Sequence, residues 1–243
     1  MSRPPSNRRR ESLQPGPRLV ALEGAYPALR ASVLAGVPKS TVYHWARKGV
    51  IVPSVSQTKE KLWSYGDLVG LRIVHWLRKQ KLVDEQIVAA TPMKQVRITL
   101  AHLDAQGIDL WRPHADSVGS SPLLVDRSGK VLIESGDGVR DVRGQQALGK
   151  VFCRLLGPFD VDGMRGPDLI RPRSHLRIIP GKLSGEPHVE DSRISSLGLY
   201  ALAIRGLSLT TISSLYPSLS HTAIQQAIEL EAELAQSGSA QAA

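Results

Sequence analysis

The chain has 243 residues, 42% of them hydrophobic, and carries 31 Lys and Arg against 22 Asp and Glu, a net charge of +9. This size allows one to three domains with a hydrophobic core, and the excess positive charge favours a polyanionic partner. The sequence contains no run of about 18 apolar residues and begins without the apolar stretch of a secretory signal, which predicts a cytoplasmic protein with no membrane partner.

The charges are distributed unevenly along the chain. Between Lys39 and Lys81, nine Lys and Arg accompany two acidic residues, a net charge of +7. From Leu183 to the last residue, two Arg accompany six acidic residues, a net charge of −4. We therefore expect the two ends of the chain to meet different partners.

Residues 1–18 are rich in Pro, Ser and Arg and contain almost nothing to bury, so the sequence predicts a disordered basic arm. Arg8, Arg9 and Arg10 form a run of cations within it. These cations could reach DNA, or the arm could serve solubility alone, and the residues favour neither reading.

The next segment, residues 19–91, predicts two short helices joined by a turn at Gly36. Leu29, Val33 and Leu34 are expected to face inward from the first helix, and the second has one apolar face. A helix-turn-helix places the opposite face of its second helix in the major groove, where hydroxyls, rings and cations suit bases and phosphates. On that face lie Lys39, Ser40, Tyr43, His44 and Arg47.

A β-hairpin pattern follows, with "VIVP" and "LWSY" flanking the polar tip "SVSQTKEK". Such a hairpin would form a wing that carries Lys59 and Lys61. Ser64 and Asp67 have the spacing of a capping box for the next helix. Arg72, His75 and Lys79 share one flank of that helix, where they could grip phosphate. The predicted DNA-binding residues are Lys39, Ser40, Thr41, Tyr43, His44, Arg47, Lys48, Lys59, Lys61 and Arg72.

The segment from Ala31 to Lys81 resembles the winged helix-turn-helix of the MerR family of transcription regulators. The motifs that carry the resemblance are Gly36-Val37, Thr41-Val42, His44-Trp45, Arg47-Lys48-Gly49 and Val50 to Pro53. The resemblance implies binding to double-stranded DNA. Because half-sites in an operator repeat about one helical turn apart, we expect a homodimer.

The middle region, residues 92–169, is predicted to link or dimerise the chain. Pro92 opens a helix whose apolar stripe contains Met93, Val96, Leu100 and Leu103. Two β-rich runs then flank a tight turn from Asp126 to Lys130, where Gly129 can adopt a positive φ. One more helix is expected from Gln145 to Leu156.

The C-terminal domain, residues 170–243, is predicted to begin with a strand-like "HLRIIP" and to continue with helices over 195–205, 209–215 and 221–235. Ser208 and Ser220 are placed as N-caps. The last helix has no Lys or Arg and a broad apolar face, which suits either a protein partner or ordinary core packing. That face comprises Ala223, Ile224, Ala227, Ile228, Leu230 and Leu234.

This end of the chain resembles a small antitoxin-associated domain. The matching positions are Pro187 and Val189, then Asp191 to Ile194, then Gly206 to Ser208, and Tyr216 to Leu219. Together with the N-terminal resemblance, the chain looks like a VapB-type antitoxin, which implies that it neutralises a PIN-like ribonuclease toxin and represses their shared operon. The residues assigned to the toxin are Arg193, Ile194, Tyr216, Ile224 and Ile228.

No nucleotide-binding, hydrolase or metal-ligand motif occurs, so we expect no enzyme, no cofactor and no metal. Two alternatives remain: a ligand-responsive MerR-like regulator, and a metal-dependent nuclease built on the acidic residues between Asp126 and Asp162. The predicted fold is mainly α with short β-hairpins (α+β), in which a winged helix-turn-helix precedes a small helical domain.

Overall fold

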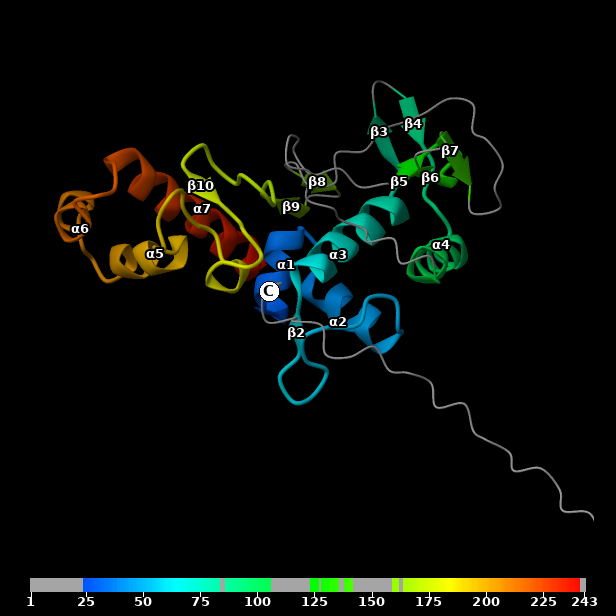
Figure 1. Ribbon diagram of the computed structural model, residues 1–243, viewed down its shortest axis with the longest axis horizontal. Helices are drawn as coiled ribbons and strands as arrows, with labels where there is room; N and C mark the ends of the chain where they lie inside the picture. The colour runs from blue at the N-terminus through cyan, green and yellow to red at the C-terminus, as the bar shows by residue number, and fades with distance from the viewer. Residues whose placement is uncertain are drawn as a thin grey trace, which may run out of the picture.

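The computed structural model describes residues 24–83, 86–105, 123–126, 128–135, 138–141, 159–161 and 164–240. Helices dominate these residues, and the strands form short antiparallel pairs and one three-stranded antiparallel sheet (Figure 1), which confirms the predicted mainly helical α+β class. The expected arm over 1–18 and the expected helix over 145–156 lie outside the described residues. No helix of the described residues is both long enough and apolar enough to cross a membrane.

Three helices form the N-terminal part of the fold: α1 (Ala28–Ala35), α2 (Lys39–Arg47) and α3 (Tyr65–Arg78). Gly36 ends α1 with a φ of 66° and a ψ of 39°, a left-handed conformation that only glycine adopts without strain, and the chain turns there into α2. The core between these helices contains the fully buried side chains of Leu34, Val42, Trp63, Leu68 and Leu71.

The segment between α2 and α3 differs from the predicted hairpin. The second arm of the predicted hairpin is β2 (Leu62–Trp63). It pairs with β1 (Tyr26–Pro27), the first element of the described chain. Within residues 50–61 a single bridge, from Ser56 to Leu62, closes the tip. Val50 and Ile51 are buried in the hydrophobic core instead of forming a strand, and the Val50 amide donates to the Trp45 carbonyl of α2 at 2.9 Å. The wing is therefore a loop, and the regular structure at its base is the bridge from Ser56 to Leu62 and the pairing of β2 with β1.

The start of α3 forms the predicted capping box. Ser64 Oγ accepts from the Asp67 amide at 3.2 Å, and Asp67 Oδ2 accepts from the Ser64 amide at 2.8 Å. The same carboxylate oxygen accepts from the Ser54 amide and hydroxyl, both at 2.8 Å. Burial raises the pKa of Asp67, although the hydrogen bonds from Ser54 and Ser64 oppose the shift. One side chain thus fixes both the helix and the base of the wing.

The middle region packs beside α3 through α4 (Met93–Ala105), whose Val96 and Leu103 are buried as predicted. The turn after β5 (Leu123–Val125) also matches the prediction: Gly129 has a φ of 79°, and Asp126 Oδ1 accepts from the amides of Ser128 and Lys130. The elements of this region are β3 (Lys81–Val83), β4 (Gln86–Val88), α4 (Met93–Ala105), β5 (Leu123–Val125), β6 (Val131–Ser135), β7 (Gly138–Asp141), β8 (Phe159–Val161) and β9 (Met164–Gly166).

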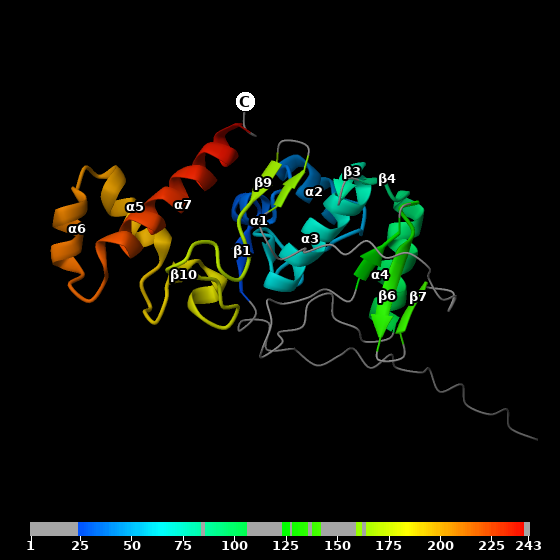
Figure 2. The same ribbon diagram turned by 90° about the horizontal axis from the view of Figure 1, so that it is seen from above.

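The C-terminal part is a strand pair followed by three helices. Ser195, Ser208 and Ser220 each accept a hydrogen bond from an amide three residues on, so the predicted caps at Ser208 and Ser220 are confirmed. The elements are β10 (Leu176–Arg177), the 3₁₀ turn η2 (Leu183–Gly185), β11 (His188–Val189), α5 (Ser196–Ile204), α6 (Leu209–Leu215) and α7 (His221–Ala240). Helix α7 runs from α6 back to α1 (Figure 2).

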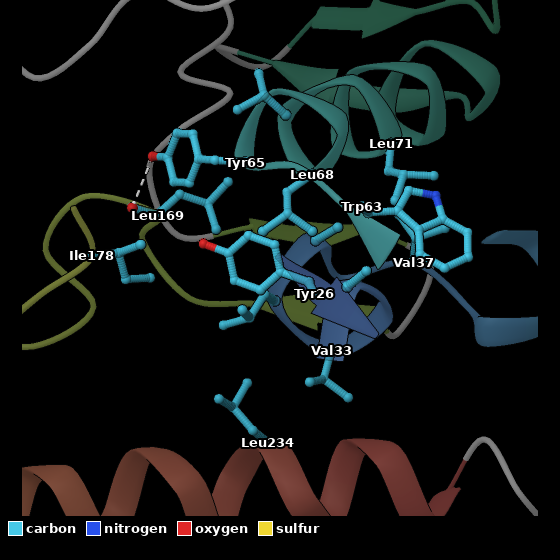
Figure 3. Packing of buried hydrophobic residues seen from close by; sticks show 14 of the residues in the cluster. Tyr26, Val33, Val37, Trp63, Tyr65, Leu68, Leu71, Leu169, Ile178 and Leu234 are labelled. Carbon is cyan, nitrogen blue, oxygen red and sulfur yellow. Dashed lines mark hydrogen bonds between the residues drawn. The ribbon is translucent and has the colours of Figure 1, made fainter. Parts of the chain in front are cut away.

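The two ends of the chain share one hydrophobic cluster. Figure 3 shows Tyr26, Tyr65 and Leu68 of the N-terminal part near Leu169 and Ile178, with Leu234 of α7 on the other side of Val33. Tyr26 donates its hydroxyl hydrogen to the Gly185 carbonyl at 2.7 Å, and Tyr65 donates to the Leu169 carbonyl at 2.9 Å. Burial raises the pKa of both phenols, so they remain donors at physiological pH.

Candidate nucleic-acid interface

The best candidate for a functional surface is the outer face of α2. Val42 and Trp45 anchor the inner face of this helix in the core, because they lie three residues apart and so share one side of it. The outer face carries exposed polar and cationic side chains, namely Lys39, Ser40, Tyr43, His44 and Arg47. The predicted division of α2 into a buried and an exposed face is confirmed.

Two neighbouring contacts hold this face in place. The ring of Tyr43 packs edge-on against the buried indole of Trp63, with centroids 6.0 Å apart. After the end of α2, Arg97 of α4 donates to the Lys48 carbonyl at 2.9 Å. Arg97 is exposed and adds a cation beside the C-terminal end of α2. Sequence spacing could not indicate this role of Arg97, because its partner lies 49 residues away in the chain.

The wing, whose base residue Trp63 contacts Tyr43 of α2, carries two further cations. Lys59 is exposed at the tip, and Lys61 is partly buried, with its ammonium group 3.3 Å from the Gln57 carbonyl. The tip is held closed by Ser56, which donates to the Glu60 carbonyl at 2.7 Å. Thr41 on α2 is also partly buried, and Lys48 is exposed. These residues, with the outer face of α2, are called the basic face below.

Arg72 does not belong to this face, which corrects the prediction that it grips phosphate. Its side chain is 0% exposed and donates to the carbonyls of Leu34 at 2.6 Å, Ala35 at 3.3 Å and Pro167 at 2.8 Å. The first two carbonyls belong to the last turn of α1, where carbonyl groups lack helical partners and attract a cation. His75 is buried too, so the expected exposed flank of α3 does not exist.

The C-terminal residues assigned to a partner fall into two groups. Ile224 is 0% exposed and, with Ala223, Ala227 and Leu230, forms part of the hydrophobic core under α5. It cannot be a docking residue, which corrects that prediction, and core packing explains the apolar face of α7. Ile194, Tyr216 and Ile228 are partly buried against the core, whereas Arg193 is exposed.

Other apolar side chains are exposed at this end instead. Ile204, at the end of α5, is 67% exposed, and Leu215, at the end of α6, is 56% exposed. Leu197 on α5 is exposed as well. The sequence-based prediction did not include these residues, because it relied on the apolar stripe of α7. Whether a side chain at a helix end is exposed depends on how the helices pack, which spacing does not show. We call Ile204 and Leu215 the α5–α6 tip.

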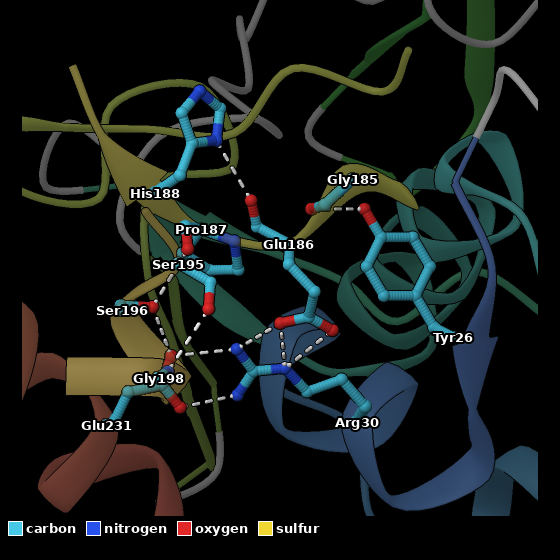
Figure 4. A network of polar contacts seen from close by, with 10 residues as sticks. All are labelled: Tyr26, Arg30, Gly185, Glu186, Pro187, His188, Ser195, Ser196, Gly198 and Glu231. Carbon is cyan, nitrogen blue, oxygen red and sulfur yellow. Dashed lines mark hydrogen bonds and ion pairs between the residues drawn. The ribbon is translucent and has the colours of Figure 1, made fainter. Parts of the chain in front are cut away.

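A buried ion network joins α1 to the C-terminal part (Figure 4). Arg30 Nη2 lies 2.6 Å from Glu186 Oε2, and Arg30 Nη1 lies 2.7 Å from Glu231 Oε2. Ser196 donates to Glu231 Oε1 at 2.5 Å. Burial disfavours the charge of Arg30, but the two carboxylates outweigh it and raise its pKa, so the guanidinium stays charged.

His188 lies beside this network and is fully buried. Its Nδ1 is 3.0 Å from the Glu186 carbonyl, and its Nε2 has no hydrogen-bond partner within the described residues. Burial lowers the pKa of His188, so the neutral ring donates from Nδ1.

No group of three or more His, Cys, Asp or Glu in the described part of the chain is arranged to hold a metal ion. Asp126, one of the acidic residues on which the nuclease alternative was built, uses its carboxylate to cap its own turn.

Comparison with known proteins identifies the C-terminal part. Residues 177–230 match the family model described as "Protein of unknown function (DUF433)", so a DUF433 domain, a small domain found in antitoxin-like proteins, is present. The match extends from β10 into α7. The X-ray crystal structure of Rv2018 from Mycobacterium tuberculosis is similar with 14% identity and a TM-score of 0.49, over 84% of this chain and 96% of that chain. No curated protein matches the sequence.

Proposed function

We propose that this protein is a DNA-binding antitoxin whose basic face reads its own promoter while its DUF433 domain holds a ribonuclease toxin. The observation that carries the first half is the basic face itself. Helix α2 presents hydroxyls, rings and cations outward from a rigid three-helix support, and the wing adds cations beside it. A recognition helix with a flanking wing needs this arrangement, as the resemblance to MerR-like regulators leads one to expect.

The contacts expected for this face divide by chemistry. Arg47 and Lys48, at the end of α2, and Lys59, at the wing tip, are suited to phosphates, which attract cations regardless of sequence. Ser40, Tyr43 and His44 carry donors and acceptors suited to base edges. Because one such unit buries little surface, two copies on adjacent half-sites would supply the affinity of a repressor.

Replacing Arg47 with Ala tests the DNA-binding half. We expect the affinity of the full chain for its own promoter and for unrelated DNA to fall by the same factor, and the slope of log affinity against log salt to become shallower by about 0.9, as for one lost phosphate contact. Fluorescence anisotropy with labelled promoter at several salt concentrations measures both. Arg193→Ala, a change to an exposed arginine of the DUF433 domain, is the matched control and should leave DNA affinity unchanged.

Two results would count against this half of the proposal. Wild-type protein that fails to bind its promoter at low salt would exclude a DNA-binding role. An affinity that stays constant as salt rises would exclude the phosphate contacts assigned to the basic face.

The second half rests on the DUF433 domain and on the α5–α6 tip. Ile204 ends α5 and Leu215 ends α6, and both side chains are more than half exposed, so they are the apolar residues of this domain that we assign to the surface covered by the partner. The partner we infer is the product of the adjacent reading frame, a small ribonuclease with an acidic centre. Arg193 lies on the same domain and can meet an acidic partner.

The double change Ile204→Ser with Leu215→Ser tests this partner surface. We expect it to weaken the complex with the co-expressed toxin at least about tenfold, because truncated anchor residues of an interface commonly cost more than 1 kcal/mol. Calorimetry or co-purification measures the loss. Thr210→Ala and Thr222→Ala, at exposed positions of α6 and α7, serve as the control pair. A complex that survives the double change unaltered would place the toxin elsewhere.

A further inference from the structure

Helix α4 contacts the end of α2 through one exposed side chain. Arg97 donates from Nη2 to the Lys48 carbonyl at 2.9 Å. The Lys48 amide donates back to the His44 carbonyl at 3.0 Å, and Gly49, with a φ of 62°, then turns the chain out of α2. Carbonyl groups at the end of a helix lack helical partners and carry a partial negative charge, which attracts a cation. The contact therefore holds the Arg97 guanidinium at the C-terminal end of the predicted recognition helix.

The guanidinium of Arg97 has unused hydrogen-bond donors. An arginine side chain carries five N–H donors in one plane, and one of them serves the Lys48 carbonyl. Within the described residues this carbonyl is the one partner of the guanidinium, and the side chain is exposed. The remaining donors can bond an acceptor on another molecule while the first bond keeps the group in place. A planar fork that is already positioned loses less freedom on binding than a mobile side chain does.

The two segments that meet at this contact are cationic and carry no acidic residue. Neither residues 36–59 nor residues 86–103 contain Asp or Glu. Lys94 precedes Arg97 by three residues and so lies on the same side of α4. Four cations of these segments are exposed and form no ion pair with any described residue, namely Arg47, Lys48, Lys94 and Arg97. The positive charge of the basic face thus continues from α2 onto α4.

We propose that Arg97 binds a backbone phosphate of double-stranded DNA beside the groove that α2 enters, so that α4 is part of the DNA-binding surface. This inference rests on the proposed function and extends its site to a second helix. Arginine suits a phosphate because two of its N–H groups can bond two phosphate oxygens at once. DNA is favoured over an acidic protein because Arg97 is bonded directly to Lys48, a residue of the basic face, so the two surfaces are continuous.

Arg97→Gln tests the phosphate contact, because the glutamine amide can still donate to the Lys48 carbonyl but carries no charge. We expect the affinity of the full chain for its promoter and for unrelated duplex DNA to fall by the same factor, about tenfold, and the slope of log affinity against log salt to become shallower by about 0.9. Fluorescence anisotropy at several salt concentrations measures both. Arg97→Lys, which keeps the charge, should retain the wild-type salt slope and part of the affinity.

A matched variant controls for the loss of an arginine at a helix end. Arg205→Gln removes an exposed guanidinium from the end of α5, and it should bind DNA with the affinity and salt slope of the wild type. If Arg97 served only to hold the end of α2, Arg97→Gln would keep the wild-type salt slope. That result would overturn the inference.

The same measurements separate this inference from the proposed function. A wild type that does not bind DNA at low salt would overturn both. A wild type that binds DNA, with a salt slope that Arg47→Ala lowers and Arg97→Gln does not, would place α4 outside the DNA-binding surface and leave the proposed function standing. An Arg97→Gln variant with normal DNA binding but weakened binding to the co-expressed toxin would assign Arg97 to the protein partner and overturn the phosphate contact.

Discussion

Replacing Arg30 with Met is expected to lower the free energy of unfolding by about 3–5 kcal/mol, because it leaves two carboxylates without their cation in a buried setting. Glu231 is almost completely buried, and Glu186 is mostly covered. Removing one partner of a buried ion network is more costly than replacing the whole network by apolar groups. Urea denaturation followed by tryptophan fluorescence measures the change, with Trp45 and Trp63 as buried reporters.

Two further variants separate the ion network from a general effect of losing an arginine. Arg193→Met removes an exposed guanidinium and should change the unfolding free energy by less than about 0.5 kcal/mol. Adding Glu231→Gln to Arg30→Met should recover part of the loss, because the amide carries no charge and its oxygen can still accept from Ser196. A double variant less stable than Arg30→Met would contradict the assignment of the cost to an unpaired carboxylate.

Replacing Arg72 with Met is expected to lower the free energy of unfolding by about 3–5 kcal/mol as well, since two buried carbonyls and one partly buried carbonyl would lose their donor at about 1–3 kcal/mol each, partly relieved by water. The carbonyls belong to Leu34, Ala35 and Pro167, so the loss loosens α1 against the segment after β9. Thermal and urea denaturation measure it. Met matches the length of the aliphatic stem, which limits the cavity that the substitution leaves.

The same variant distinguishes a structural arginine from a DNA contact. Under conditions where Arg72→Met remains folded, its promoter affinity and salt slope should equal those of the wild type, in contrast to Arg47→Ala. A variant with wild-type stability but reduced DNA affinity would restore the sequence-based assignment. Comparing Arg72→Met with Arg47→Ala therefore tests whether Arg72 has a structural role or contacts DNA.

The parts of the fold that could be predicted from the sequence depend on residues close together in the chain. Gly36 ends α1, Asp67 caps α3, and Asp126 closes its turn, and each acts within five residues of its own position. Local hydrogen bonds and backbone preferences decide such features, so spacing alone indicates them. The buried and exposed faces of α2 followed from helical periodicity in the same way.

The errors arose where distant segments cover a helix. Periodicity placed Arg72 with Lys79 on an outer flank, but the backbone at Pro167, 95 residues later, lies over Arg72. Leu29 was expected inside, yet its side chain is 47% exposed. Ile224 was assigned to a partner, yet it lies on the face of α7 that faces the hydrophobic core. Only the packing of α5 against α7 shows that this face is covered by the protein itself. Periodicity shows that a face is apolar but does not show what covers it.

Helix α7 reaches α1 and so ties the stability of the N-terminal helices to the C-terminal end of the chain. Leu234 and Glu231 on this helix cover Val33 and neutralise Arg30 on α1, the helix that supports α2. A protease that nicked the chain before His221 would strip that support as well as the helical scaffold of the DUF433 domain. Under the proposed function, cleavage at a single exposed loop would weaken both promoter binding and toxin binding in one event, without any cut inside the basic face.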